Sequence, residues 1–261
     1  MPATPPILCY HKVDTRLELG FTRIGPRLFR RQVEALAKAG YQGIGSSALL
    51  GTPRFPIPDS RFPVVFSFDD AYSGLAEHAF PVLAEYGFRA LVFVITDFVG
   101  RENTWDVQYG WRKFFHLSWD QLAHWQQRGI EVHSHGVSHA RLTWLSDDQV
   151  ADELGRSREV IASRLGASPS GISYPFGAAD ERVRNLAAAA GYSLGFAGPT
   201  VAKPGDPLMM ERKPVYAWDA FAPPLVMRPG GAGAFARGVA RVTNRCAVGT
   251  AIIQRALGRA Y

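Results

Sequence analysis

Short apolar runs rich in β-branched residues alternate with amphipathic patterns of helical period along most of the chain. The runs predict strands at 6–10, 41–45, 63–68, 90–95, 129–134, 171–176, 193–198 and 214–218. The helical patterns predict helices at 26–39, 75–86, 118–128, 146–165 and 180–190. Two of these helices begin with capping boxes, Ser118 with Gln121 and Ser146 with Gln149. Strand and helix in alternation predict an α/β fold with a parallel sheet, and we favour a (β/α) barrel over a doubly wound sheet.

Composition narrows the class of protein without naming an activity. The 261 residues are 47% hydrophobic and 20% charged, which is ordinary globular composition, and no apolar run reaches the length of a membrane span. Cys9 and Cys246 are too few for a disulfide framework or a four-cysteine zinc site. No glycine-rich phosphate loop follows a predicted strand. The first residues lack the pattern of a secretory signal, so we expect a cytoplasmic protein.

The positive charge lies at the end of the chain. Residues 223–261 hold six arginines and no acidic residue, so the other 23 basic residues of 1–222 balance all 23 acidic ones. A basic main domain for nucleic acid is therefore not indicated. We expect a catalytic domain at 1–222, followed by a glycine-rich hinge and a basic amphipathic C-terminal helix at 223–261. That helix either contacts an anionic membrane surface peripherally or docks on its own domain.

Polar side chains follow three of the predicted strands. Asp69 and Asp70 end the run at 63–68, and His135 and His139 follow the run at 129–134. Carboxyl ends of parallel barrel strands share one face, so these groups can converge. Two histidines four residues apart with one carboxylate suit a hydrolytic zinc site, in which the second carboxylate is free to accept a proton. We expect His133 to point to the other face of its strand, in a packing role.

The same ligand set describes the non-haem Fe(II) oxygenases. The strand and helix alternation does not suggest their double-sheet jelly roll, and an oxygenase has no use for a second carboxylate beside the ligand. We therefore favour a hydrolase.

Taken together, Ser-Phe-Asp69-Asp70, His135-Gly-Val-Ser-His139 and Ser173-Tyr-Pro-Phe176 resemble the motifs of the polysaccharide deacetylase family, the NodB-homology deacetylases of carbohydrate esterase family 4. The resemblance runs from about residue 6 to residue 220. It implies a distorted (β/α) barrel and an N-acetylated saccharide substrate. It also implies Asp70, His135 and His139 as ligands of a divalent metal, for which we expect zinc, and Asp69 as general base. The backbone N–H of Phe176 would help to hold the oxyanion.

The chain departs from the family pattern at two places. Ser173 stands where the third motif usually begins with an arginine, and Arg212 is a candidate replacement. No histidine follows His139 to act as the usual general acid. The segment Ile7-Leu-Cys-Tyr-His11 resembles a subgroup related to poly-N-acetylglucosamine deacetylases, and we assign His11 as the acid.

Aromatic residues near these motifs are candidates for sugar contacts, because flat rings stack on sugar faces. We expect Trp105, Tyr174 and Phe176 to contact the saccharide. The sequence leaves two alternatives open. One is a hydrolase of another amide or of an ester on the same metal site, and the other is a silent saccharide-binding domain.

Overall fold

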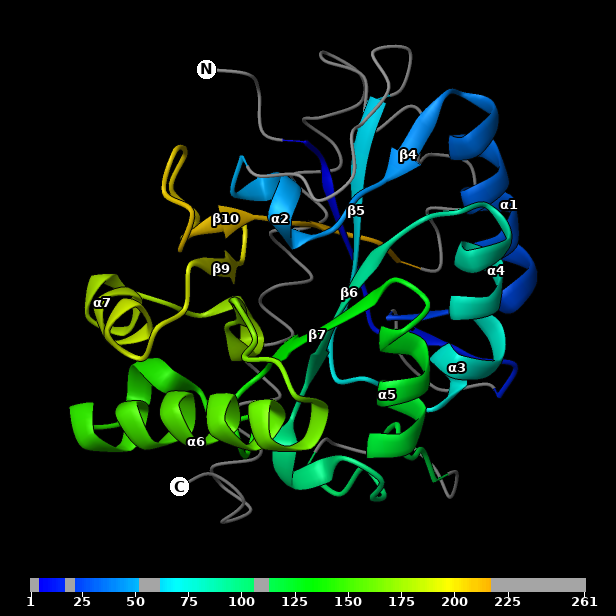
Figure 1. Ribbon diagram of the computed structural model, residues 1–261. Coiled ribbons are helices and arrows are strands. Elements are labelled where there is room, and N and C mark those ends of the chain that lie inside the picture. Colours follow the sequence, from blue (N-terminus) through cyan, green and yellow to red (C-terminus); the bar gives the residue numbers. More distant parts are fainter. Residues whose placement is uncertain (1–4, 17–21, 52–61, 106–112, 217–261) are drawn as a thin grey trace.

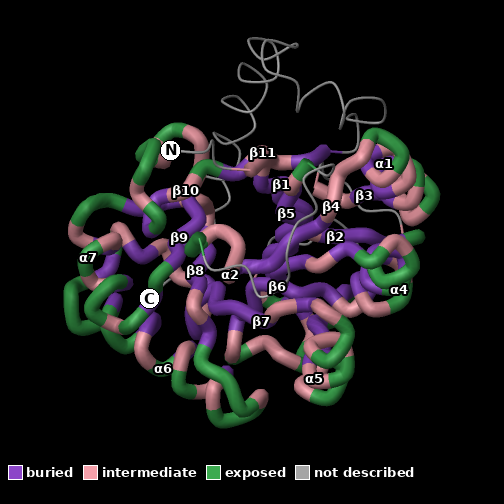
Figure 2. The backbone as a smooth tube through the Cα atoms, turned by 45° about the horizontal axis from the view of Figure 1, so that its top comes forward, coloured by how far each residue is buried: buried purple, intermediate pink, exposed green. Residues whose placement is uncertain are grey.

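The computed structural model describes residues 5–16, 22–51, 62–105 and 113–216, and its centre is a ring of parallel strands (Figures 1 and 2). The strand order is β10-β9-β8-β7-β6-β5-β1-β11, with β4 also paired to β5. The strands are β1 (Ile7–Tyr10), β4 (Tyr41–Gly43), β5 (Phe62–Phe68), β6 (Ala90–Val94), β7 (Ile130–Ser134), β8 (Gly171–Ser173), β9 (Leu194–Ala197), β10 (Met210–Glu211) and β11 (Lys213–Pro214). A separate pair joins β2 (Lys12–Val13) to β3 (Arg23–Ile24).

One short segment brings the two ends of the sheet together. β10 pairs in parallel with β9, and β11, after a single intervening residue, pairs in parallel with β1. Arg212 is that intervening residue. The sheet therefore curls into a nearly closed barrel, which confirms the predicted (β/α) barrel over the doubly wound alternative.

Helices cover the outside of the ring (Figure 1). They are α1 (Pro26–Lys38), α2 (Ser46–Leu49), α3 (Gly74–His78), α4 (Phe80–Glu85), α5 (Trp119–Gln126), α6 (Asp147–Leu165) and α7 (Glu181–Ala189). Both predicted capping boxes are present, at the starts of α5 and α6. The single helix predicted at 75–86 is instead two helices, because Pro81 in the first turn of α4 has no backbone N–H to continue α3.

Alternate residues of the strands face two different layers. On β5, Val64, Phe66 and Phe68 belong to a large cluster with residues of the covering helices. Val65, between them, packs instead with a smaller cluster of strand residues that fills the barrel. Ala48 and Leu49 of α2 pack against this inner cluster and close the barrel at the amino ends of its strands. The opposite end, where the strands finish, is left for polar side chains.

Two predictions fall outside the described residues or are left untested by them. The basic segment 223–261 lies outside them, so its helix, its membrane contact and its docking stay predictions, as does the cytoplasmic location.

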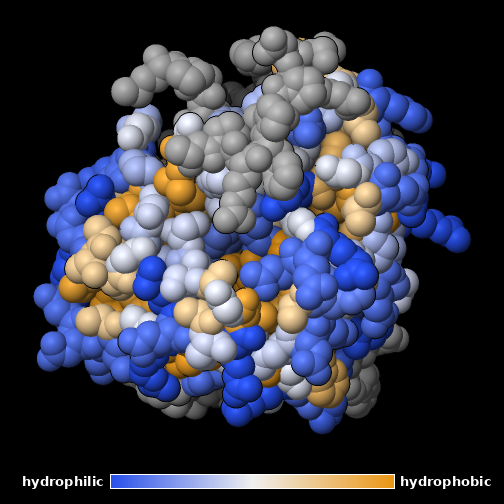
Figure 3. All heavy atoms as spheres, viewed as in Figure 1, coloured by the Kyte–Doolittle hydropathy of each residue, from blue (hydrophilic) through white to orange (hydrophobic). Residues whose placement is uncertain are grey.

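Within the described residues, no helix is both long enough and apolar enough to cross a bilayer. The face seen in Figure 3 is mostly hydrophilic, with scattered hydrophobic patches.

Candidate metal centre and neighbouring acid–base residues

The adjacent carboxylates Asp69 and Asp70 both reach the mouth of the barrel because β5 ends one residue before them. Asp69 keeps the inward direction of Val65, two strand periods earlier. Asp70 and Ala71 then take φ angles of 65° and 54°, in the left-handed region that L-residues rarely adopt. This turn brings the second carboxylate back toward the barrel axis, and both side chains are buried.

Asp70, His135 and His139 converge as the sequence predicts. The Oδ1 atom of Asp70 lies 3.4 Å from Nε2 of His135 and 3.7 Å from Nε2 of His139. One ligand atom from each residue lies within 4.8 Å of the other two, and all three residues are buried. A carboxylate and two imidazoles are a ligand set that holds zinc and related divalent cations while leaving positions open for water.

The imidazoles are in the state that a cation requires. His135 Nδ1 lies 2.7 Å from the carbonyl oxygen of Ser173, which fixes Nδ1 as the protonated nitrogen and leaves the Nε2 lone pair facing Asp70. Burial lowers the pKa of His135 and holds that of His139 well below its usual value. Both imidazole rings are therefore neutral at neutral pH, and each can offer a nitrogen lone pair to a metal. The residues present fit a divalent cation.

Glu153 of α6 holds the turn that carries the two histidines, and sequence reasoning missed it. Its Oε2 accepts hydrogen bonds from the backbone N–H groups of Val137 at 2.7 Å and Ser138 at 3.2 Å. The Ser138 hydroxyl donates to Oε1 at 2.5 Å. At Gly136, where φ is +81°, an added Cβ would come within 2.9 Å of the same carboxylate. The buried Glu153 thus shapes the spacing of His135 and His139.

Replacing Glu153 by Gln is expected to weaken cation binding by about 10–100-fold, the range found for groups that orient metal ligands. The amide has one acceptor oxygen where the carboxylate has two, so part of the turn loses its restraint. Competitive titration of zinc against a chelating dye measures the change. Glu159→Gln, on the same helix but without a contact to this turn in the structure, is the matched control. Equal zinc affinity in Glu153→Gln and the wild type would contradict this role.

Arg212 holds Asp69 with two parallel hydrogen bonds. Its Nη1 and Nη2 donate to Oδ1 and Oδ2 of Asp69 at 2.7 Å each, and Nη2 also donates to the Ser173 hydroxyl at 2.8 Å. Burial raises the pKa of Asp69, but the charge and hydrogen bonds of Arg212, together with the nearby His135 and His11, outweigh burial and hold that pKa below its usual range. The guanidinium expected at the third motif therefore comes from the segment that closes the barrel, and Ser173 binds it.

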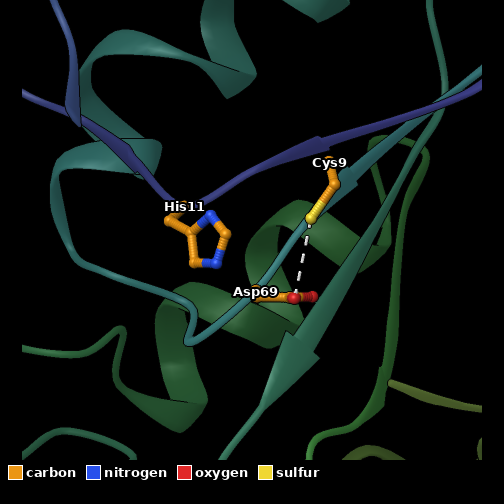
Figure 4. Close-up of side chains that lie close together, drawn as sticks. All are labelled: Cys9, His11 and Asp69. Carbon is orange, nitrogen blue, oxygen red and sulfur yellow. Dashed lines mark hydrogen bonds between the residues drawn. The ribbon is translucent and has the colours of Figure 1, made fainter. Parts of the chain in front are cut away.

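His11 follows β1 and lies beside Asp69, as Figure 4 shows. β1 and β5 are neighbours in parallel register, and the backbone N–H of Asp69 donates to the Tyr10 carbonyl at 2.9 Å. His11 is partly exposed, whereas Asp69 is buried. Desolvation of the ring lowers the pKa of His11 to about 4, although the Asp69 charge opposes this. The imidazole is therefore neutral at neutral pH.

Two aromatic side chains line the centre. The Trp105 ring lies 3.9 Å from the His139 ring, and the Phe176 ring lies 4.7 Å from it, measured between centroids. Phe176 has a φ of 60°, so the non-glycine residues with left-handed φ in the described chain are Asp70, Ala71, His139 and Phe176. Such backbone strain collects at functional sites, and here it accompanies the predicted ligands.

His116 links Trp105 to the turn that carries Asp70 through two hydrogen bonds. The sequence around His116 does not predict this role. The His116 Nδ1 atom hydrogen-bonds the Asp70 carbonyl, while the Trp105 indole N–H donates to His116 Nε2 at 3.4 Å. Indole nitrogen only donates, so His116 is neutral with its proton on Nδ1. Burial lowers the pKa of His116 to about 4, which agrees with that state.

Two expectations about neighbouring residues need correction. Tyr174 does not join the site, because its side chain is fully buried and its hydroxyl donates to the Leu208 carbonyl at 3.0 Å. His133 does pack, but the predicted face was wrong. Strand side chains repeat every two residues, so His133 points into the barrel like His135, one layer deeper. There its ring lies 5.7 Å from that of Phe93.

Comparison with known proteins agrees with this geometry. Residues 57–195, more than half of the chain, match the family described as polysaccharide deacetylase. The chain belongs to the polysaccharide deacetylase family. Its matched region includes β5 to β8 and every residue of the Asp70, His135 and His139 set.

Named relatives cover part of the chain. YxkH of Bacillus subtilis, a candidate polysaccharide deacetylase, is 29% identical over 197 residues, which are 74% of this chain and 64% of YxkH. The poly-β-1,6-N-acetyl-D-glucosamine N-deacetylase of Staphylococcus aureus is 26% identical over 148 residues, 52% of this chain and 49% of that protein. The chain thus spans about half to two thirds of the length of these relatives.

Solved structures share the fold. The Streptococcus pyogenes deacetylase PplD in complex with acetate aligns with a TM-score of 0.72 and 21% identity, covering 88% of this chain and all of that one. IcaB from Ammonifex degensii aligns with a TM-score of 0.69 and 23% identity, covering 84% and 94%. At these identities the likeness shows the NodB-type barrel alone.

Proposed function

We propose that this polysaccharide deacetylase family member is a divalent-cation-dependent hydrolase that removes N-acetyl groups from an acetamido sugar. The observation that carries the proposal is the pairing of a buried Asp70, His135 and His139 ligand set with an adjacent carboxylate, Asp69, that Arg212 keeps ionised. A metal-ligand set alone would suit a structural or storage site. Hydrolysis also requires a base that is not itself a metal ligand, and Asp69 is the proposed base.

Each residue has a defined part in the reaction. A cation held by Asp70, His135 and His139 would supply Lewis-acid polarisation of the acetamide carbonyl. Asp69 accepts the proton of the attacking water, because its carboxylate is ionised and held in one orientation by Arg212. The backbone N–H of Phe176 is the proposed donor to the carbonyl oxygen as it becomes negative.

His11 is the proposed acid for the leaving amine. The neutral imidazole has to gain a proton before it can donate one. Asp69 lies within 4.8 Å of it, so the proton removed from water can pass to His11 and then to the nitrogen of the breaking C–N bond. A pKa of about 4 makes the protonated ring a strong donor.

The aromatic wall supports a saccharide as the substrate. Trp105 and Phe176 present flat apolar surface next to His139, and sugar faces stack on such surface. The staphylococcal relative is named for poly-β-1,6-N-acetyl-D-glucosamine, which makes that polymer the first substrate to test. Lipid-linked acetamido sugars are the second, because of the predicted basic segment at 223–261.

Acetate release tests the proposal directly. Zinc-loaded wild type is incubated with oligomers of β-1,6-linked N-acetylglucosamine, with other N-acetylated oligosaccharides, with lipid-linked acetamido sugars, and with simple acetyl esters and amides. We expect release from a saccharide that increases with zinc and is lost in Asp69→Asn. Release only from the non-saccharide esters or amides would overturn the substrate class. Saccharide binding without release from any substrate would favour the silent binding domain.

A further inference from the structure

A second group of metal-ligating side chains lies next to the Asp70 set. Cys9, His11 and Asp69 each offer one ligand atom, and these atoms lie within 4.8 Å of one another. From this geometry we infer a second cation site that takes zinc or a chemically similar divalent cation through the Cys9 sulfur, a His11 nitrogen and an Asp69 oxygen. Occupation of this site would stop the reaction, a consequence that rests on the function proposed above.

The backbone explains why the side chains of Cys9, His11 and Asp69 lie close together. Cys9 lies on β1 opposite Ser67 of β5, and Tyr10 lies opposite Phe68, so His11 comes level with Asp69 at the end of the pair. Cys9 and His11 are two residues apart and share a face. Figure 4 shows the three side chains directed toward one another, from two neighbouring strands.

The distances suit a small tetrahedral site. The Cys9 sulfur lies 3.7 Å from Oδ2 of Asp69 and donates a hydrogen bond to it. Zinc bonds of about 2.3 Å to sulfur and about 2.0–2.1 Å to nitrogen or oxygen place neighbouring ligand atoms roughly 3.5 Å apart. The Cys9 sulfur and the Asp69 oxygen are thus close to the separation of two zinc ligands. His11 follows the strand and is partly exposed, so it is the ligand that has to move toward the other two.

Charge makes this site weaker than the Asp70 set. The Arg212 guanidinium already binds Asp69 and repels a second cation. Binding would expel the thiol proton, however, and the resulting thiolate supplies a compensating negative charge. Burial raises the pKa of the Cys9 thiol, while Arg212 lowers it, so the proton is retained until a cation displaces it. We therefore expect this site to fill only after the first one.

Occupation has a chemical consequence for the same reaction. A cation bound to Asp69 and His11 uses the lone pairs with which these residues accept protons. Water would no longer lose its proton to Asp69, and His11 could not carry one to the leaving amine. Zinc is therefore expected to activate the protein at one equivalent and to inhibit it in excess.

Cobalt(II) distinguishes the two sites, because a thiolate ligand adds an intense near-ultraviolet charge-transfer band. The Asp70 set contains no sulfur, so the band reports the Cys9 site alone. Cys246, the other cysteine of the chain, is removed in a Cys246→Ser background. We expect that background variant to bind two cobalt ions per chain, with the band growing during the second equivalent. Adding Cys9→Ser, or Cys9→Ala as a second version, should leave one bound ion and no band.

A second experiment measures acetate release by each variant, and compares the rate at excess zinc with the rate at one equivalent of zinc. Inhibition of Cys246→Ser that Cys9→Ser removes supports the inference. A stoichiometry of one cobalt ion without the band in the Cys246→Ser protein overturns the site, as does a band that persists after Cys9 is replaced. The cobalt titration needs no turnover, so a band in a protein that releases no acetate would count against the proposed function and not against the site.

Discussion

Replacing Asp69 by Asn is expected to lower kcat/KM for acetate release by a factor of about 10²–10⁴, the contribution typical of a positioned general base. The amide has the size of the carboxylate but cannot accept the proton of water. The ligand set Asp70, His135 and His139 is untouched, so the affinity for the first equivalent of zinc should stay close to that of the wild type. Steady-state acetate release and competitive zinc titration measure the two quantities separately.

Asp70→Asn is the matched comparison, since it changes the neighbouring residue by the same group. That variant should lose both zinc affinity and turnover, because Asp70 is the carboxylate that faces His135 and His139. Should Asp69→Asn lose the first equivalent of zinc as severely as Asp70→Asn, Asp69 would be a ligand of the Asp70 site and not the base.

Arg212→Met is expected to destabilise the protein by about 3–5 kcal/mol, the usual effect of removing one partner from a buried ion pair. Asp69 is only 4% exposed, and its carboxylate would lose both hydrogen bonds that Arg212 donates. Urea denaturation of the zinc-free proteins gives the difference in free energy of unfolding. Because the double variant Asp69→Asn with Arg212→Met leaves no unpaired charge, it should cost less than the two single changes added together.

The Arg212→Met substitution is also expected to change the pH dependence of kcat/KM. Without Arg212, burial raises the pKa of Asp69, so the acidic limb of kcat/KM should move to higher pH. In the wild type the depressed pKa contributes stability above the ordinary aspartate value of about 3.9, and this contribution is lost as pH falls from there toward the folded-state value. Arg212→Lys keeps the charge and should shift the limb less. An unchanged limb in Arg212→Met would contradict the coupling.

Local patterns are enough to predict the main strands and helices and the candidate metal ligands of this chain. The candidate ligands come after two strands that begin with apolar and β-branched residues, β5 and β7, and Asp70, His135 and His139 lie within five residues of the strand ends. Parallel topology then places these residues on one face of the barrel. The convergence therefore needs no long-range information beyond the order of strands and helices.

The supporting contacts have no such local signal. Glu153 is one acidic residue among several on an amphipathic helix, and His116 lies in a stretch without strong periodicity. Their partners, the turn after His135 and the carbonyl of Asp70, are defined only once the helices pack on the barrel. Arg212 could be proposed as a substitute for the missing arginine, but the short strands on both sides of it are too brief to show a period.

Barrel closure is expected to be a late step in completing the candidate site during folding. The segment 210–214 is the last described part of the barrel, and Arg212 meets Asp69 across 143 positions of sequence. Contacts between such distant positions form slowly, because a long loop has to be ordered first. A chain that has formed β5 to β9 can already assemble the Asp70, His135 and His139 set. Arg212 reaches Asp69 from the segment between β10 and β11, so a chain in which β11 has not paired with β1 is expected to bind the cation before its proposed base is oriented.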